Sequence, residues 1–174
     1  MDISKFPTLQ RHLEKRAFLE ASPETKKLSR DLMHEMLELL LGMYLLYYEL
    51  HWKYRSRYGD HLLFERLYES VQKEIDTLAE KLIGYHGPDE LELIELVAGA
   101  NEFIKKWTVG NEDFIGQALS AEKTLQSLFD KNYKVMKSKG VLPMGFDDFI
   151  MAACNDHETH TYLLQQVREG RGRK

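Results

Sequence analysis

The chain has 174 residues, of which 43% are hydrophobic and 30% charged, and its formal net charge is −4. This length suits one domain with a sizeable core, and the single cysteine, Cys154, excludes an internal disulfide and a cysteine-rich zinc site. We therefore expect one domain over residues 1–174 in a reducing, cytoplasmic compartment.

No segment predicts export or a membrane span. The first 22 residues have basic side chains but no continuous apolar core of the kind that a signal peptide needs. The longest apolar run, Leu39–Tyr48, is ten residues, whereas a bilayer needs about 20. We expect no membrane partner.

The charge is unevenly distributed along the chain. Residues 1–30 have seven basic and four acidic side chains, and residues 168–174 have four and one. Each end therefore has a net charge of +3. Because the whole chain has a net charge of −4, the body between the ends has a net charge of −10. An acidic body is compatible with attracting cations, and the basic ends could contact phosphates or merely improve solubility.

The spacing of apolar residues predicts four long helices and no strand. The first helix begins at Ser22-Pro23, because serine suits the N-cap and proline the first helical position. Its apolar side chains form two adjacent stripes, which indicates two buried faces. The helix breaks at Tyr54–Gly59. The second long helix has an N-cap at Asp60 and is ended by Gly84 and Gly87-Pro88. The later elements are a shorter connector within Asp89–Lys106, a long helix from after Asn111 to Gly140, and a long helix from near Asp147 to about Arg168.

This order predicts an all-α, ferritin-like four-helix bundle. A connector helix between the second and third long helices allows an up-down-down-up arrangement. No repeat or change in composition indicates a second domain. Residues of about 1–22 are expected as an N-terminal extension and those of about 169–174 as a basic C-terminal tail.

A polar stripe runs along the second predicted helix. Each residue of a helix is rotated by about 100° from the one before it. On this basis the members of the stripe lie within an arc of roughly 100° around the helix axis, and the centre of this arc is about 120° away from the core stripe of the same helix. The stripe therefore faces a flank of the bundle, which could meet solvent, as Glu69 and Lys73 beside it suggest, or another subunit. Its members are His61, Glu65, Gln72, Asp76 and Glu80.

The spacing within this stripe limits what one chain can bind. Glu65 and Asp76 are eleven residues apart, which is about 16 Å along a helix and too far for one metal centre. An antiparallel pairing of the helix with its copy would bring opposite ends of the two stripes together. Imidazole and carboxylate donors suit iron, and His51 lies near enough in the sequence to join them.

Three segments resemble the signature of the Dps family of miniferritins. They are His51-Trp52 at the end of the first helix, His61–Glu65 at the start of the second, and Asp76–Lys81 with its Asp-x-x-Ala-Glu pattern. The resemblance covers about residues 25–168. The chain departs from it at Glu65, where the family usually has aspartate, and in a stretch between the two histidines that is two residues shorter. The Glu-x-x-His motif of ordinary ferritins is absent.

The resemblance implies a ferroxidase site shared between two subunits. Its ligands for Fe(II) would be His51, His61 and Glu65 of one chain, facing Asp76 and Glu80 of the two-fold mate. It further implies oxidation by hydrogen peroxide or dioxygen, storage of ferric mineral in a homo-oligomer that is a dodecamer, and protection against oxidative damage. The alternative is a ferritin-like oligomer without a working ferroxidase site, which acts as a nucleoid-binding or scaffolding protein.

Several other residues allow both a structural and a functional interpretation. Asp148 matches a family position that lines acidic pores, but an acid near a helix start also suits the helix dipole. Trp52 either packs or takes up an oxidising equivalent beside the iron site. His157 and His160 lie near the inward stripe of the last helix, so we expect core or interface histidines rather than ligands. DNA is a possible but not favoured partner, and its candidate contacts are Arg168, Arg171, Arg173 and Lys174.

Overall fold

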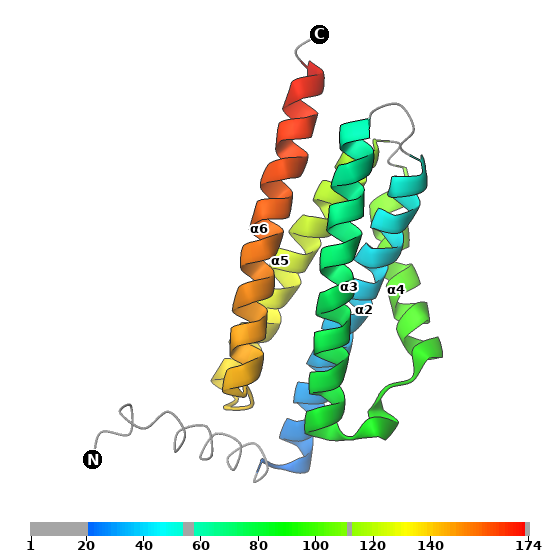
Figure 1. The fold of residues 1–174 in the computed structure, drawn as a ribbon. Coiled ribbons are helices and arrows are strands. Elements are labelled where there is room, and N and C mark those ends of the chain that lie inside the picture. Colours follow the sequence, from blue (N-terminus) through cyan, green and yellow to red (C-terminus); the bar gives the residue numbers. More distant parts are fainter. Residues whose placement is uncertain (1–20, 54–57, 111–112, 173–174) are drawn as a thin grey trace, which may run out of the picture.

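The computed structural model describes residues 21–53, 58–110 and 113–172. Within these ranges the chain is helical and has no strand. The elements in chain order are α2 (Pro23–Lys53), α3 (Tyr58–His86), the 3₁₀ turn η2 (Pro88–Glu90), α4 (Leu93–Thr108), α5 (Phe114–Ser138) and α6 (Met144–Gly172) (Figure 1).

The four long helices form one bundle. Helix α2 contacts α3 and α5, and α6 contacts the same two helices from the other side, so that the four surround a common core (Figure 1). Helix α4 lies outside this ring and packs mainly on α2. The predicted all-α bundle, with its connector between the second and third long helices, is confirmed. None of the described helices is long and apolar enough to cross a membrane.

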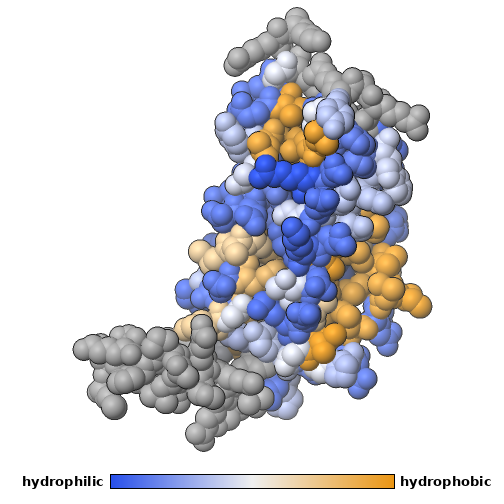
Figure 2. All heavy atoms as spheres, viewed as in Figure 1, coloured by the Kyte–Doolittle hydropathy of each residue, from blue (hydrophilic) through white to orange (hydrophobic). Residues whose placement is uncertain are grey.

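The position of α4 explains the two apolar stripes of α2. One stripe faces the bundle core, where Met36, Met43 and Leu46 are fully buried, and the other faces α4. The helices come close at Gly42, where an added Cβ would lie 3.0 Å from the backbone oxygen of Ala100. A small residue is therefore needed at this crossing. On the outer side of α4, Leu93, Ile94 and Val97 are exposed, and Figure 2 shows apolar surface gathered there.

Several predicted helix ends were wrong. Helix α3 begins at Tyr58, so Asp60 is a buried residue of its first turn and not its N-cap. The same helix continues through Gly84 to His86 and stops at Gly87, so the predicted end at Gly87-Pro88 is confirmed. The φ of 110° at Gly87 is unfavourable for other residues.

The third long helix follows Asn111 as predicted, whereas the last helix is longer than predicted. Helix α5 is capped by Asp113, whose side chain accepts a hydrogen bond from the Ile115 N–H, whereas Asn111 lies outside the described residues. Helix α6 begins at Met144, before the predicted start near Asp147, and continues to Gly172.

Candidate metal centres

The end of α2 and the start of α3 bring His51 and His61 together. Their rings stack with centroids 3.8 Å apart. Each Nδ1 lies 3.1 Å from the backbone carbonyl oxygen of the other histidine. Because a carbonyl only accepts hydrogen bonds, each Nδ1 must carry a proton, and Nε2 is the nitrogen left to bind a metal. A proton on Nδ1 belongs to the tautomer that binds a metal through Nε2.

The acids of the predicted site lie along α3, away from this pair. Glu65 is half-buried one turn after His61, whereas Asp76 and Glu80 are exposed further along the helix. Asp76 lines an open groove together with the polar side chains of Glu69, Gln72 and Lys73. Within one chain, therefore, the structure brings the two histidines together and leaves Asp76 and Glu80 apart from them.

A second group of titratable side chains lies in the middle of the bundle. All four long helices contribute to it, and four of its five members are at most 3% exposed, the fifth, Glu74, being 8% exposed. Nδ1 of His157 donates to Oε2 of Glu122 at 2.6 Å, and its Nε2 donates to Oε2 of Glu74 at 2.9 Å. The Tyr47 hydroxyl donates to Oε1 of Glu122 at 2.5 Å. We call this set the interior polar cluster: Tyr47, Glu74, Glu122, His157 and His160.

His160 is the fifth member of the interior polar cluster. Its Nδ1 makes no hydrogen bond with a described residue. That atom lies 3.7 Å from Oε1 of Glu122, which is longer than a hydrogen bond. The other oxygen of Glu74, Oε1, is also buried and has no partner in the described part of the chain. Among the described residues, one group of three donors is close enough to hold a metal ion, and it is Glu122, His157 and His160.

The charges of the interior polar cluster stabilise one another. Burial alone would lower the pKa of His157, but the charges of Glu122 and Glu74 and the hydrogen bonds to them raise it to about 10. Burial likewise opposes ionisation of Glu122, yet His157 and His160 outweigh it and lower the pKa of that carboxyl. Burial and the nearby Glu122 charge raise the pKa of Tyr47 well above its ordinary value. The cluster therefore holds an imidazolium between two carboxylates.

The sequence prediction of buried histidines at 157 and 160 is confirmed, but it missed the acids that face them. The apolar stripes of α3 and α5 contain the signal that could have revealed these acids. Glu122 falls between Ala118 and Leu125 in the core stripe of α5, and Glu74 falls between Val71 and Leu78 in that of α3. An acid at a core position needs a partner of opposite charge or a metal.

The remaining predicted residues lie at the surface. Asp148 is exposed near the start of α6. Trp52 is 59% exposed, and its ring centroid lies 4.5 Å from that of Tyr48. Of the candidate DNA contacts, Arg168 is exposed on α6, Arg171 lies in the last turn of that helix, and residues 173–174 lie outside the described residues.

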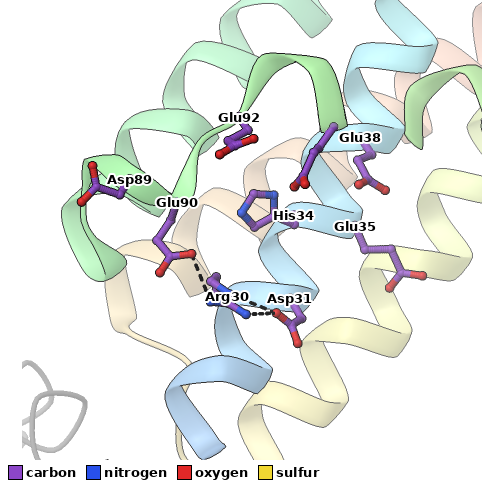
Figure 3. Close-up of a pocket in the computed structure, with 9 residues that line it drawn as sticks. Arg30, Asp31, His34, Glu35, Glu38, Asp89, Glu90 and Glu92 are labelled. Carbon is purple, nitrogen blue, oxygen red and sulfur yellow. Dashed lines mark hydrogen bonds and ion pairs between the residues drawn. The ribbon is translucent and has the colours of Figure 1, made fainter. Parts of the chain in front are cut away.

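An acidic surface cavity of about 410 Å³ lies where α2 meets η2 and α4 (Figure 3). His34 projects between the two sides, and Arg30 pairs with Asp31 and Glu90. Burial first, and then the neighbouring Glu35 and Glu95, raise the pKa of Glu38. No set of three donors in the described part of this cavity converges as closely as Glu122, His157 and His160 do. The lining residues are Arg30, Asp31, His34, Glu35, Glu38, Asp89, Glu90, Glu92 and Glu95.

Comparison with solved structures identifies the fold. No family model and no curated protein match the sequence. The structure matches that of Dps from Thermosynechococcus elongatus with a TM-score of 0.66 and 20% sequence identity, over 83% of this chain and 94% of that chain. The chain has the fold of a Dps subunit. The expected ferritin-like, Dps-like bundle is thereby confirmed, with η2 and α4 as the connector of this Dps-like fold.

Proposed function

We propose that the protein binds Fe(II) at a site shared by two subunits, oxidises it with hydrogen peroxide or dioxygen, and stores the ferric product inside a homo-oligomer. In this proposal, His51, His61 and Glu65 of one chain and Asp76 and Glu80 of its two-fold mate bind the iron. The dodecamer and the protective role against oxidative damage belong to the same proposal.

The observation that carries the proposal is the reciprocal bonding of His51 and His61. Two imidazoles whose Nδ1 atoms are both fixed by backbone carbonyls present two Nε2 atoms from adjacent stacked rings. Packing alone does not require this tautomer of both histidines, whereas metal binding through Nε2 does. The neighbouring Glu65 adds a carboxylate, which suits Fe(II) as well.

The geometry of α3 supports a two-fold partner as the source of the missing acids. The pair His61 and Glu80 is centred between residues 70 and 71 of α3, and so is the pair Glu65 and Asp76. If a two-fold axis passes this point, antiparallel copies of α3 place His61 opposite Glu80 and Glu65 opposite Asp76. The axis then creates two identical sites.

The other residues of this α3 face suit the same pairing. The exposed Tyr58 would lie opposite Ile83, and the exposed Leu62 opposite Ala79. Apolar side chains would thus meet at both ends of the pair. At the centre, Glu69 would lie opposite Gln72, so that a carboxylate could accept from an amide and like charges would not meet.

The proposed reaction balances electrons without a further reductant. Two Fe(II) ions each give up one electron, and one hydrogen peroxide accepts both electrons and two protons to form two waters. Dioxygen accepts two electrons and two protons to form hydrogen peroxide. An aromatic path connects the histidines with the surface: the ring centroids are 5.3 Å apart for His51 and Tyr68, 4.9 Å for Tyr68 and Tyr48, and 4.5 Å for Tyr48 and Trp52. The path supports a role of Trp52 in taking up an oxidising equivalent.

DNA binding is not part of the proposal. The candidate contacts are few, and the body of each chain carries −10, which repels phosphates. Asp148 remains a candidate for guiding Fe(II) through the shell, because an exposed acid attracts cations.

The test is Fe(II) oxidation by the full-length protein. Fe(II) is added without oxygen, hydrogen peroxide follows, and ferric absorbance is recorded together with the oligomer size. We expect His51→Ala and Asp76→Ala each to lower the initial rate at least about 10-fold, since each removes an iron ligand. The melting temperature should change little, because both side chains lie outside the bundle core.

Glu69→Gln is the matched control, because it removes an exposed carboxylate from the same helix face but keeps an oxygen that can accept from Gln72 in the proposed contact. It should leave the rate unchanged. An oligomer whose His51→Ala and Asp76→Ala variants oxidise Fe(II) as fast as Glu69→Gln does would contradict the proposed site.

A further inference from the structure

The interior polar cluster contains metal-type donors that the proposed iron site does not use. One donor atom each of Glu122, His157 and His160 lies within 4.8 Å of the other two. The first two residues are 0% exposed and His160 is 3% exposed. Tyr47, Glu74 and these three residues lie inside one bundle, so no second subunit is needed to bring them together.

The hydrogen bonds within the interior polar cluster leave two of its atoms unpaired among the described residues. Nδ1 of His160 faces Oε1 of Glu122 at 3.7 Å and makes no hydrogen bond. Oε1 of Glu74 is likewise buried without a partner among the described residues. Buried polar atoms normally have a partner, because leaving one unpaired is costly. Two unpaired atoms at one buried place indicate that the cluster accommodates something besides its own side chains.

The charge of the interior polar cluster points to a cation. Glu74 and Glu122 bring two carboxylates into the core, and His157, which lies between them, can offset only one negative charge. A divalent cation would offset both. Because uncompensated charge in an apolar interior is unfavourable, a divalent ion fits the cluster better than a monovalent one.

The hydrogen bonds of the interior polar cluster orient its donors. Glu74 accepts from Nε2 of His157, which leaves Nδ1 of His157 on the side of Glu122. A carboxylate behind a ligating histidine is the usual outer support of a metal site. Tyr47 donates to Glu122 and fixes the orientation of that carboxylate. The Nδ1 atoms of His157 and His160 thus face the same carboxylate, at 2.6 and 3.7 Å.

We propose that Glu122, His157 and His160 bind one divalent transition-metal ion within each subunit. Two imidazoles with one carboxylate favour Fe(II), Mn(II), Co(II) or Zn(II) over the all-oxygen ions Mg(II) and Ca(II). Metal–ligand bonds of about 2.0–2.2 Å would replace the hydrogen bond between His157 and Glu122, and the proton on Nδ1 of His157 would be released to solvent. The ion would cross-link α5 and α6 in the core, and it is separate from the iron that turns over at the surface of α2 and α3.

The probe is Co(II) alone, titrated into chelator-treated, full-length protein with the substitutions His51→Ala and His61→Ala. These substitutions remove the imidazoles of the surface site and leave the interior polar cluster intact. We expect one Co(II) per chain, with visible absorption typical of bound Co(II), and a higher melting temperature with Co(II) than without it. Failure of the iron site would not affect this result.

Two further substitutions in that background decide the assignment. His160→Leu removes a donor that makes no hydrogen bond at Nδ1, so the chain should fold, and Glu122→Gln keeps the shape of the second donor. Each should weaken Co(II) binding at least about 10-fold and remove the thermal shift. If Glu122→Gln does not fold, the Co(II) binding of His160→Leu alone tests the assignment.

His34→Leu is the matched control, because His34 lies in the acidic surface cavity of Figure 3. It should leave Co(II) binding unchanged. The proposal is overturned if the parent variant binds no Co(II), if His160→Leu binds it as well as the parent, or if His34→Leu abolishes the binding.

Discussion

At the scale of single residues, two backbone carbonyls determine what His51 and His61 can do. Each carbonyl fixes the proton of the opposite imidazole on Nδ1. Each ring therefore has Nε2 as the nitrogen that can bind a cation. His157 is the opposite case, because carboxylates at both of its nitrogens favour the charged ring. The same residue type thus serves as a ready donor at the surface and as a counter-ion in the core.

The state of His157 predicts how the stability of the metal-free protein depends on pH. Its pKa is raised from 6.5 to about 10 in the folded chain. The stabilisation is therefore complete below pH 6.5 and is lost as the pH rises towards 10, because the folded state then binds more protons than the unfolded state. The free energy of unfolding should fall by up to about 1.4 kcal/mol per pH unit in this interval.

Urea unfolding of chelator-treated protein between pH 6.5 and 10 measures this slope. His157→Gln should be less stable at pH 7 and should show a smaller slope. Equal slopes for the two proteins would mean that His157 is not protonated in the core.

At the scale of helices, the crossing of α2 and α4 depends on one missing side chain. A Cβ at Gly42 would lie 3.0 Å from a backbone oxygen of α4 and 3.4 Å from Phe103 and Trp107. Gly42→Ala should therefore destabilise the chain by about 1–3 kcal/mol, since the backbone of α4 must move. Gly84→Ala is the matched control within a helix, because nothing lies within 4 Å of its added Cβ.

The control should stabilise the chain by about 0.5–1 kcal/mol, as alanine does in an open helical position. Denaturant unfolding of both variants gives the comparison. A stable Gly42→Ala protein would show that α4 is not held closely against α2.

The number and order of the helices could be predicted from the sequence, because burial against neighbours imposes a helical period on apolar residues. Some of the helix ends could not. Whether a helix begins at Tyr58 or Asp60 depends on tertiary contacts, as the burial of Asp60 shows. The candidate iron residues were found by resemblance, whereas Glu74 and Glu122 were overlooked because only packing reveals that an acid and a histidine from distant segments meet.

At the scale of the whole molecule, the face of α3 should form the two-fold contact. Ile83 is 37% exposed in the single chain and would lie opposite Tyr58 of the mate, so Ile83→Glu should bury a charge in this contact. We expect this variant to form smaller oligomers by sedimentation, with unchanged helix content. Met151→Glu changes an exposed apolar residue on α6 instead and is the control for a general effect of surface charge. Unchanged assembly of Ile83→Glu would remove α3 as the contact.

The central claim is that two subunits share one iron site, and complementation between inactive chains tests it most directly. One chain has His51→Ala and His61→Ala, and the other has Asp76→Ala and Glu80→Ala. A mixed two-fold pair keeps one whole site of its two, so random exchange should restore about one quarter of the wild-type rate of Fe(II) oxidation. Mixed oligomers that are shown by mass to contain both chains and still do not oxidise Fe(II) would contradict the account.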